Sequence, residues 1–213
     1  IDENAEIGIE SNPENLSSSY LESLKTLPIN RLSIGVQSFF DDDLVLMNRN
    51  HLSIDSHNAI GNATKLFDNV SIDLMFGLPY SGLKRWKENL DIATDFNVKH
   101  ISTYNLTVEE KTALARKVAK KELPIESDDT LNSMYLYTME YLKSKGFNQY
   151  EISNFGKEEY YSKHNMNYWN GTHYLGFGPS AHSYLNAVRR ANVSNINTYI
   201  SNIKSKKSYW ELS

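Results

Sequence analysis

The sequence predicts an α/β domain built on a parallel β-sheet. Short runs at residues 6–10, 31–37 and 70–75 alternate apolar residues with small or polar ones, which is the two-residue period of a strand. The segments between these runs carry apolar residues at helical spacing instead. Strands alternating with helices indicate parallel strands joined by right-handed crossovers. We expect further strands at 100–106 and 147–151 in the same sheet.

The expected helices have recognisable ends. Asn12 and Pro13 are typical of a helix cap and a first-turn residue, and the acidic run at 41–43 suits the positive start of a short helix. Ser53 or Ser56 opens the next helix, and the longest runs from Ser127 to Gly146. The residues expected to face the sheet are Leu16, Tyr20, Leu24, Leu27, Ile60, Ala63, Phe67, Trp86, Leu90, Ala93, Leu131, Tyr135 and Leu142.

Composition narrows the class of protein. The chain has 213 residues, 40% of them hydrophobic, and a net charge of −4. It has no long basic block, so we expect no nucleic-acid partner. It has no apolar run long enough for a membrane span and no signal peptide, so we expect a cytoplasmic protein. It contains no cysteine, which excludes disulfides and iron–sulfur ligation by this chain.

Three polar residues stand toward the ends of the predicted strands. Glu10, Gln37 and Asp73 share the face that otherwise carries Gly and Ser. The carboxyl ends of parallel strands meet at one edge, where α/β proteins bind their ligands. We therefore expect these side chains to converge on one cavity. The alternative is that the three residues only mark where strands stop.

The last third of the chain differs from the rest. Aliphatic periodicity fades after residue 150, while aromatic residues, Asn, His and Gly accumulate. Such a segment can be a loop-rich wall held by side-chain hydrogen bonds. It can also line a pocket for a flat, partly polar ligand, because aromatic rings stack and histidine ligates iron. His164, followed by Tyr168 and Trp169, is the candidate for that role, although a single histidine is more often structural.

At these motifs the chain resembles the radical S-adenosylmethionine family of oxygen-independent coproporphyrinogen III oxidases and their relatives, most of all its HemW-like haem chaperone branch. The His-Asn-x-x-Tyr-Trp pattern, which the oxidase branch lacks, favours the chaperone branch. The matching stretches are residues 9–13, 30–39, 73–79, 149–151, 164–169 and 176–183.

The resemblance implies a truncated, laterally open radical-SAM-type (β/α) partial barrel with parallel strands. Residues 1–150 would form its central and C-terminal part. Residues 151–213 would be an aromatic extension that packs on the barrel and leads to a C-terminal domain. It also implies S-adenosylmethionine or second-ligand positions at Glu10, Gln37, Arg49, Asp73, Thr107 and His182, and haem positions at His164, Tyr168 and Trp169.

The chain also departs from this family. The family's cluster-binding Cys-x-x-x-Cys-x-x-Cys loop has no counterpart here, and the chain begins without Met. We therefore expect a piece of a longer protein that itself binds neither a [4Fe–4S] cluster nor S-adenosylmethionine tightly and is inactive alone. An exposed sheet edge would then favour self-association.

Three functions follow from the resemblance. The first is a carrier that binds haem for transfer to a haem-accepting protein. The second is a coproporphyrinogen III oxidase, which removes two propionate carboxyls of a porphyrinogen through radical chemistry, with Arg49 well placed for a ligand carboxylate. The third is the same barrel acting on an unrelated radical substrate. The sequence names no catalytic residue.

Overall fold

A computed structural model describes residues 2–212, and the chain divides into two compact units at residues 161/162. The sequence places this boundary at 150/151. The difference arises because the strand β6 (Asn154–Gly156), which follows the predicted boundary, pairs with β4 (His100–Asn105) and so completes the sheet of the first unit. Each unit is described separately below.

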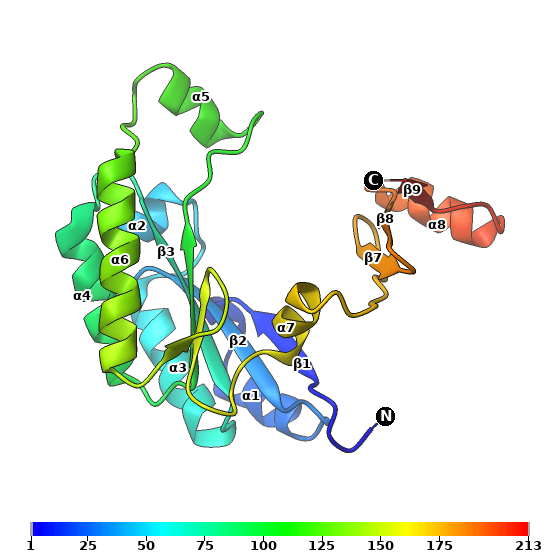
Figure 1. The fold of residues 1–213 in the computed structure, drawn as a ribbon, viewed down its shortest axis with the longest axis horizontal. Helices are drawn as coiled ribbons and strands as arrows, with labels where there is room; N and C mark the ends of the chain where they lie inside the picture. Colours follow the sequence, from blue (N-terminus) through cyan, green and yellow to red (C-terminus); the bar gives the residue numbers. More distant parts are fainter. Residues whose placement is uncertain (1, 213) are drawn as a thin grey trace. The chain divides into compact units, whose positions relative to one another are not determined.

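The first unit is built on a six-stranded sheet with the order β1-β2-β3-β4-β6-β5 (Figure 1). Its first four strands are β1 (Gly8–Ser11), β2 (Arg31–Gln37), β3 (Val70–Phe76) and β4, and all four run parallel. These four parallel strands confirm the predicted α/β class and four of the five predicted strands. β1 lies at one edge of the sheet.

The fifth predicted strand is only partly correct. Residues 147–151 were expected to form a further parallel neighbour, but β5 covers only Asn148–Gln149 and pairs with β6 rather than β4. β6 runs antiparallel to both of its neighbours. The chain turns back immediately after β5, where the Tyr150 amide donates to the Asn154 carbonyl at 3.2 Å. This tight return places β6 between β5 and β4.

Helices cover one face of this sheet and enclose the core (Figure 1). Even-numbered residues of β2 and β3, such as Ile34 and Ile72, pack against buried side chains from α1, α3, α4 and α6. Trp86 is the largest fully buried side chain, and its indole N–H donates to Thr138 Oγ1 at 2.8 Å. The helices of this unit are α1 (Ser18–Lys25), α2 (Asp41–Leu46), α3 (Ser53–Leu66), α4 (Gly82–Asp95), α5 (Ala113–Ala119) and α6 (Asp128–Ser144).

The first predicted helix is divided in two. Residues 13–15 form a 3₁₀ turn, η1 (Pro13–Asn15), and α1 begins separately because Ser17 caps it by accepting from the Tyr20 amide at 3.2 Å. The break changes which residues face the core. Leu16, Leu21 and Leu24 are buried, whereas Tyr20 and Leu27 are exposed, contrary to the prediction.

The second unit has a different construction. Its sheet is antiparallel and has three strands, β7 (His182–Leu185), β8 (Val188–Asn192) and β9 (Trp210–Leu212). Two helices accompany it, α7 (Lys163–Trp169) and α8 (Ile196–Lys204). Across both units, no helix in the described range has the length and apolar character that a membrane span requires.

Candidate functional site

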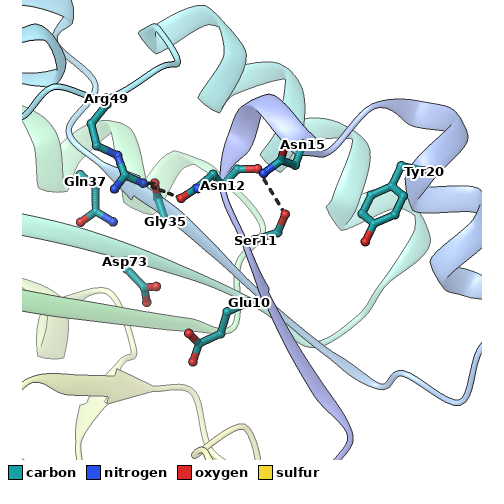
Figure 2. A pocket seen from close by; sticks show the side chains of 9 residues that line it. All are labelled: Glu10, Ser11, Asn12, Asn15, Tyr20, Gly35, Gln37, Arg49 and Asp73. Atoms are coloured by element: carbon teal, nitrogen blue, oxygen red, sulfur yellow. Dashed lines mark hydrogen bonds between the residues drawn. The ribbon is translucent and has the colours of Figure 1, made fainter. Parts of the chain in front are cut away.

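Glu10, Gln37 and Asp73 line one cavity of about 590 Å³ in the first unit. Figure 2 shows their carboxyl and amide groups on the same side of the sheet. This convergence confirms the expectation drawn from their shared parity, because the roomy face of each strand opens toward the cavity. The full lining is Glu10, Ser11, Asn12, Asn15, Tyr20, Gly35, Gln37, Arg49 and Asp73.

The backbone of Gln37 is unusual for a residue other than glycine. Its φ is 67°, and the pairing of β2 with β3 shifts register between Ile34 and Gln37. A register irregularity of this kind re-aims a side chain, and the left-handed backbone of Gln37 marks where β2 departs from regular strand geometry. Alternation predicts the face on which Gln37 lies, but not this local distortion.

Asp73 is the cavity residue whose carboxyl has a shifted pKa. Removal from water raises the pKa of its carboxyl to about 6, and the nearby charge of Glu10 adds to this rise. Hydrogen bonds from Ser102 and Ser33 oppose the rise without cancelling it, and the Ser33 hydroxyl lies 3.2 Å from Asp73 Oδ1. The cavity therefore holds two carboxyl groups whose mutual repulsion a cationic ligand would relieve.

Arg49 supplies the positive charge on the opposite wall. Its Nη2 donates to Asn12 Oδ1 at 2.5 Å and to the Gly35 carbonyl at 3.4 Å (Figure 2). Gly35 keeps this wall open, because a Cβ there would stand 3.0 Å from Gln37 Nε2 and 3.5 Å from Arg49 Nη2. The cation and the carboxylates thus line one space, with Arg49 on the segment between α2 and α3, Glu10 on β1 and Asp73 on β3.

A second cavity of about 610 Å³ adjoins the first, and Gln37 and Arg49 line both. Its other walls are mostly apolar, with Lys117 as a second cation. Thr107, a predicted wall position, is exposed in the loop after β4 and lies outside both linings. The apolar lining consists of Val45, Leu46, Met47, Met75, Leu78, Pro79, Leu106, Ala113, Leu114 and Leu123.

The predicted haem residues lie on α7 in the second unit. His164 and Tyr168 are one helical turn apart, with ring centroids at 4.8 Å, and both line a cavity of about 970 Å³. Trp169 is not part of this lining and is 58% exposed. His182, predicted at a wall of the S-adenosylmethionine region, lines the same cavity as His164.

Sequence reasoning missed two groups of residues near these sites. Tyr174, Tyr184 and Arg189 line the cavity of the second unit, and the aromatic-rich composition of this segment did not single out any of the three. Glu14 Oε2 and His51 Nδ1 lie 3.1 Å apart, close in sequence to the cavity residues Asn12 and Arg49. The two partners lie far apart in sequence, so only the fold reveals the pair.

Clusters of metal ligands are not found in the described part of the chain. Residues 2–212 contain no group of three or more His, Cys, Asp or Glu side chains arranged to hold a metal ion. The chain also lacks cysteine throughout. These residues therefore do not fit an iron–sulfur cluster, and we assign none of its ligands here.

Known proteins resemble the chain over nearly its whole length. A protein from Bacillus subtilis (strain 168), named heme chaperone HemW, is 39% identical over 203 residues, which are 95% of this chain and 54% of that protein. The chain is homologous to HemW-type radical S-adenosylmethionine proteins. A zebrafish (Danio rerio) relative named radical S-adenosyl methionine domain-containing protein 1, mitochondrial, is 37% identical over 84% of the chain and 40% of its own length.

The fold agrees with this homology. The solved structure of coproporphyrinogen III oxidase (HemN) from Escherichia coli, titled a radical SAM enzyme, matches with a TM-score of 0.81 at 23% identity. It covers 97% of this chain and 50% of that one, and it confirms the predicted radical-SAM fold. The chain spans about half the length of the HemW relatives it matches, and no family model matches it.

Proposed function

We propose that the protein carrying this chain is a HemW-type haem chaperone with two ligand sites. S-adenosylmethionine binds in the cavity of the first unit, and haem binds in the cavity of the second. The observation that carries the haem assignment is the pairing of His164 with an aromatic-walled cavity, in a chain whose relatives are named haem chaperones. Transfer of haem to an acceptor protein is the activity we infer.

The first cavity suits S-adenosylmethionine by charge and shape. That ligand carries a sulfonium, an ammonium and a carboxylate, together with ribose hydroxyls. Glu10 and Asp73 would attract its cationic groups and accept from the hydroxyls, while the Arg49 guanidinium would pair with its carboxylate. Gly35 leaves space for the ligand to approach the backbone. Bound beside an iron–sulfur cluster, S-adenosylmethionine supplies radical chemistry, and the cluster ligands are not among the residues of this chain.

The second-unit cavity suits a flat macrocycle with carboxylates. Tyr168 stands edge-on to Tyr174 at 4.7 Å, and both rings belong to the lining with Tyr184. Aromatic faces of this kind stack on porphyrins, and an imidazole is a strong ligand for haem iron. His164 is exposed, so its ring is accessible to a ligand that enters the cavity. Arg189 supplies a guanidinium at the wall for a propionate.

The oxidase remains a second candidate because of one observation. The apolar cavity next to the first site has two cations in its lining, Arg49 and Lys117. A porphyrinogen has an apolar ring body and several carboxylates, so it matches this lining as well. In that function the substrate would lie beside S-adenosylmethionine in the first unit, and the second-unit cavity would not be the principal tetrapyrrole site.

A haem titration of the full-length protein separates the two candidates. We expect the wild type to show a Soret band characteristic of histidine ligation, and His164→Ala to lose that band and most of its affinity while keeping its circular dichroism spectrum. His173→Ala is the matched control, because His173 is exposed in the same unit but lies outside the lining. A folded wild type that binds no haem, yet decarboxylates coproporphyrinogen, would assign the oxidase function instead.

A further inference from the structure

Gln37 reaches the first cavity through a turn that regular strand geometry does not contain. Its φ is 67°, and the Ser38 amide donates to the Val36 carbonyl at 2.8 Å, so the three residues form a γ-turn with positive φ. This form of the γ-turn is rare and strained. Figure 2 shows the Gln37 side chain in the lining of the cavity. A strained turn persists only where the surrounding structure holds it in place.

Strand pairing supplies part of that constraint. β1 pairs with β2 only as far as Ile34, so the end of β2 has a neighbouring strand on one side only. That neighbour is β3, and its pairing with β2 shifts register between Ile34 and Gln37. The residues that follow Gln37 supply the rest of the constraint.

A buried polar network holds these following residues. Asn89 of α4 accepts through Oδ1 from the Phe39 amide at 2.7 Å, and the Ser38 hydroxyl donates to Asp43 Oδ2 of α2 at 2.7 Å. The Ser38 and Asn89 side chains contact each other at 3.3 Å. Arg85, also on α4, donates to Asp43 Oδ1 at 2.9 Å. Ser38, Asp43 and Asn89 are at most 2% exposed, so water cannot readily replace a lost bond.

We infer that Asn89 is a positioning residue for the first cavity, because it holds the backbone after Gln37 and so keeps the Gln37 amide directed at the ligand. Asn89 itself lies outside the lining. A glutamine amide both donates and accepts hydrogen bonds, so it suits the hydroxyls and the carboxylate of S-adenosylmethionine. The inference deepens the proposed S-adenosylmethionine site and rests on that proposal for its functional consequence.

The ring of Phe39 anchors the same segment but has a different effect. It packs against His57 and Phe96, with ring centroids at 5.2 and 6.0 Å, and this fixes where residue 39 lies. A fixed side chain leaves the preceding peptide groups free to rotate about their φ and ψ bonds. The bond from the Phe39 amide to Asn89 fixes the orientation of its peptide group. Without Asn89, we therefore expect the chain to stay folded and the turn at Gln37 to relax.

The first test measures the strain in the full-length protein without any ligand. Glycine adopts positive φ readily and alanine does not, so Gln37→Gly should unfold at a higher urea concentration than Gln37→Ala. Asn89→Ala should abolish most of this difference, because a relaxed backbone no longer requires positive φ. Thr138→Val is the control. It removes the buried hydrogen-bond partner of Trp86, another residue of α4, and should leave the difference unchanged.

Two results of this unfolding comparison would overturn the inference. One is a glycine–alanine difference that stays the same size when Asn89→Ala is added, which would show that the turn does not depend on Asn89. The other is the lack of any difference in the wild-type background, which would show that the backbone of Gln37 is not strained.

The second test follows S-adenosylmethionine affinity by calorimetry in the same protein. Asn89→Ala and Gln37→Gly are each expected to weaken binding about tenfold, the loss of one hydrogen bond to the ligand. Asn89→Ala should add nothing to Gln37→Gly, because Asn89 acts through the side chain that this variant lacks. Thr138→Val also loses a buried hydrogen bond, and it should bind as wild type does. Equal weakening by Asn89→Ala with and without the Gln37 side chain would contradict the positioning role.

Ser38→Ala keeps the test decisive if Asn89→Ala does not fold. It removes one hydroxyl of the same network and leaves the Asn89 bond to the Phe39 amide in place. Its effect on affinity should be smaller than tenfold and should disappear in the Gln37→Gly background, and a loss that persists there would refute the inference. Absence of S-adenosylmethionine binding in wild type would instead refute the proposed function and leave the unfolding comparison standing.

Discussion

The two units of this chain hold their candidate sites by different means. In the first unit, the polar groups of the cavity project from strands whose opposite faces are fully buried, such as β2 and β3. In the second unit, the buried residues within the described range are Ser162 and Asn192, and no described apolar side chain there is buried. The amide of Asn192 donates to the carbonyls of Gly176 and Gly178, and partly exposed rings contact one another, as Tyr199 and Tyr209 do with their centroids 5.5 Å apart.

The difference indicates different kinds of binding. A cavity on a packed sheet is preorganised, and its side chains are already placed for a charged ligand. An exposed aromatic surface without an apolar core of its own gains burial when a ligand covers it. Phe177, 83% exposed in the lining of the second cavity, is the clearest example. We expect the first site to be rigid and the second to be stabilised by its ligand.

The largest effect expected from this comparison is on stability. Trp86→Ala in the first unit should lower the free energy of unfolding by about 3–5 kcal/mol, because it removes a fully buried ring and its hydrogen bond to Thr138. Phe177→Ala, a comparably large apolar truncation at an exposed position, should change it by less than about 0.5 kcal/mol. Urea unfolding of both variants measures this. Equal losses would show that the second unit has a packed core after all.

A smaller effect concerns ligand charge in the first cavity. Arg49→Gln is expected to weaken S-adenosylmethionine binding by about 10- to 100-fold, since a charge-assisted contact to the ligand carboxylate is lost. Arg49→Lys should recover only part of the affinity, because lysine lacks the two-pronged donor geometry. Calorimetry of the full-length protein gives both values. Arg116→Gln, on the exposed surface of α5, is the control and should bind as wild type does.

A third effect, of about the same size, is the pH dependence of the free energy of unfolding due to Asp73. Its pKa is raised from 3.8 to about 6 in the folded state, so between these values the folded protein retains a proton that the unfolded chain has lost. The free energy of unfolding contributed by Asp73 therefore falls as the pH rises from about 4 to 6 and is constant above. Asp73→Asn should remove this fall and stabilise the protein by roughly 1–3 kcal/mol at pH 7.

Asp95→Asn provides the comparison, because Asp95 is exposed at the end of α4. Thermal unfolding measured from pH 4 to 7 should show that the free energy of unfolding depends on pH in the same way for wild type and Asp95→Asn. If the free energy of unfolding of Asp73→Asn still fell as the pH rose from 4 to 6, a group other than Asp73 would cause the fall.

The sequence predicted the first unit well for a physical reason. Where one face of a strand packs on a core, residue parity decides which side chains point to the opposite face, and this is why Glu10, Gln37 and Asp73 were placed correctly. Residue parity does not indicate where two paired strands shift register, or which side chains from different connecting segments contact each other. The backbone of Gln37 and the contact between His51 and Glu14 depend on both, so only the structure reveals them.

In the second unit, the sequence indicated the residue types but not their arrangement. Helical spacing places His164 and Tyr168 on one face, whereas Trp169, five positions after His164, points elsewhere and does not line the cavity. His182, which the resemblance assigns to a wall of the S-adenosylmethionine region, lines the cavity of His164 within the second unit. Because no stripe of apolar side chains is buried in the described part of this unit, no repeating pattern in the sequence predicts where the side chains of this cavity lie.

We propose that two ligands occupy separate sites, one on each unit. A crossed titration tests it: haem and S-adenosylmethionine are each titrated into wild type, His164→Ala and Arg49→Gln forms of the full-length protein. We predict that His164→Ala loses haem binding and keeps S-adenosylmethionine binding, and that Arg49→Gln does the reverse. If Arg49→Gln abolished haem binding while His164→Ala left it intact, the tetrapyrrole would bind in the first unit and the account would be wrong.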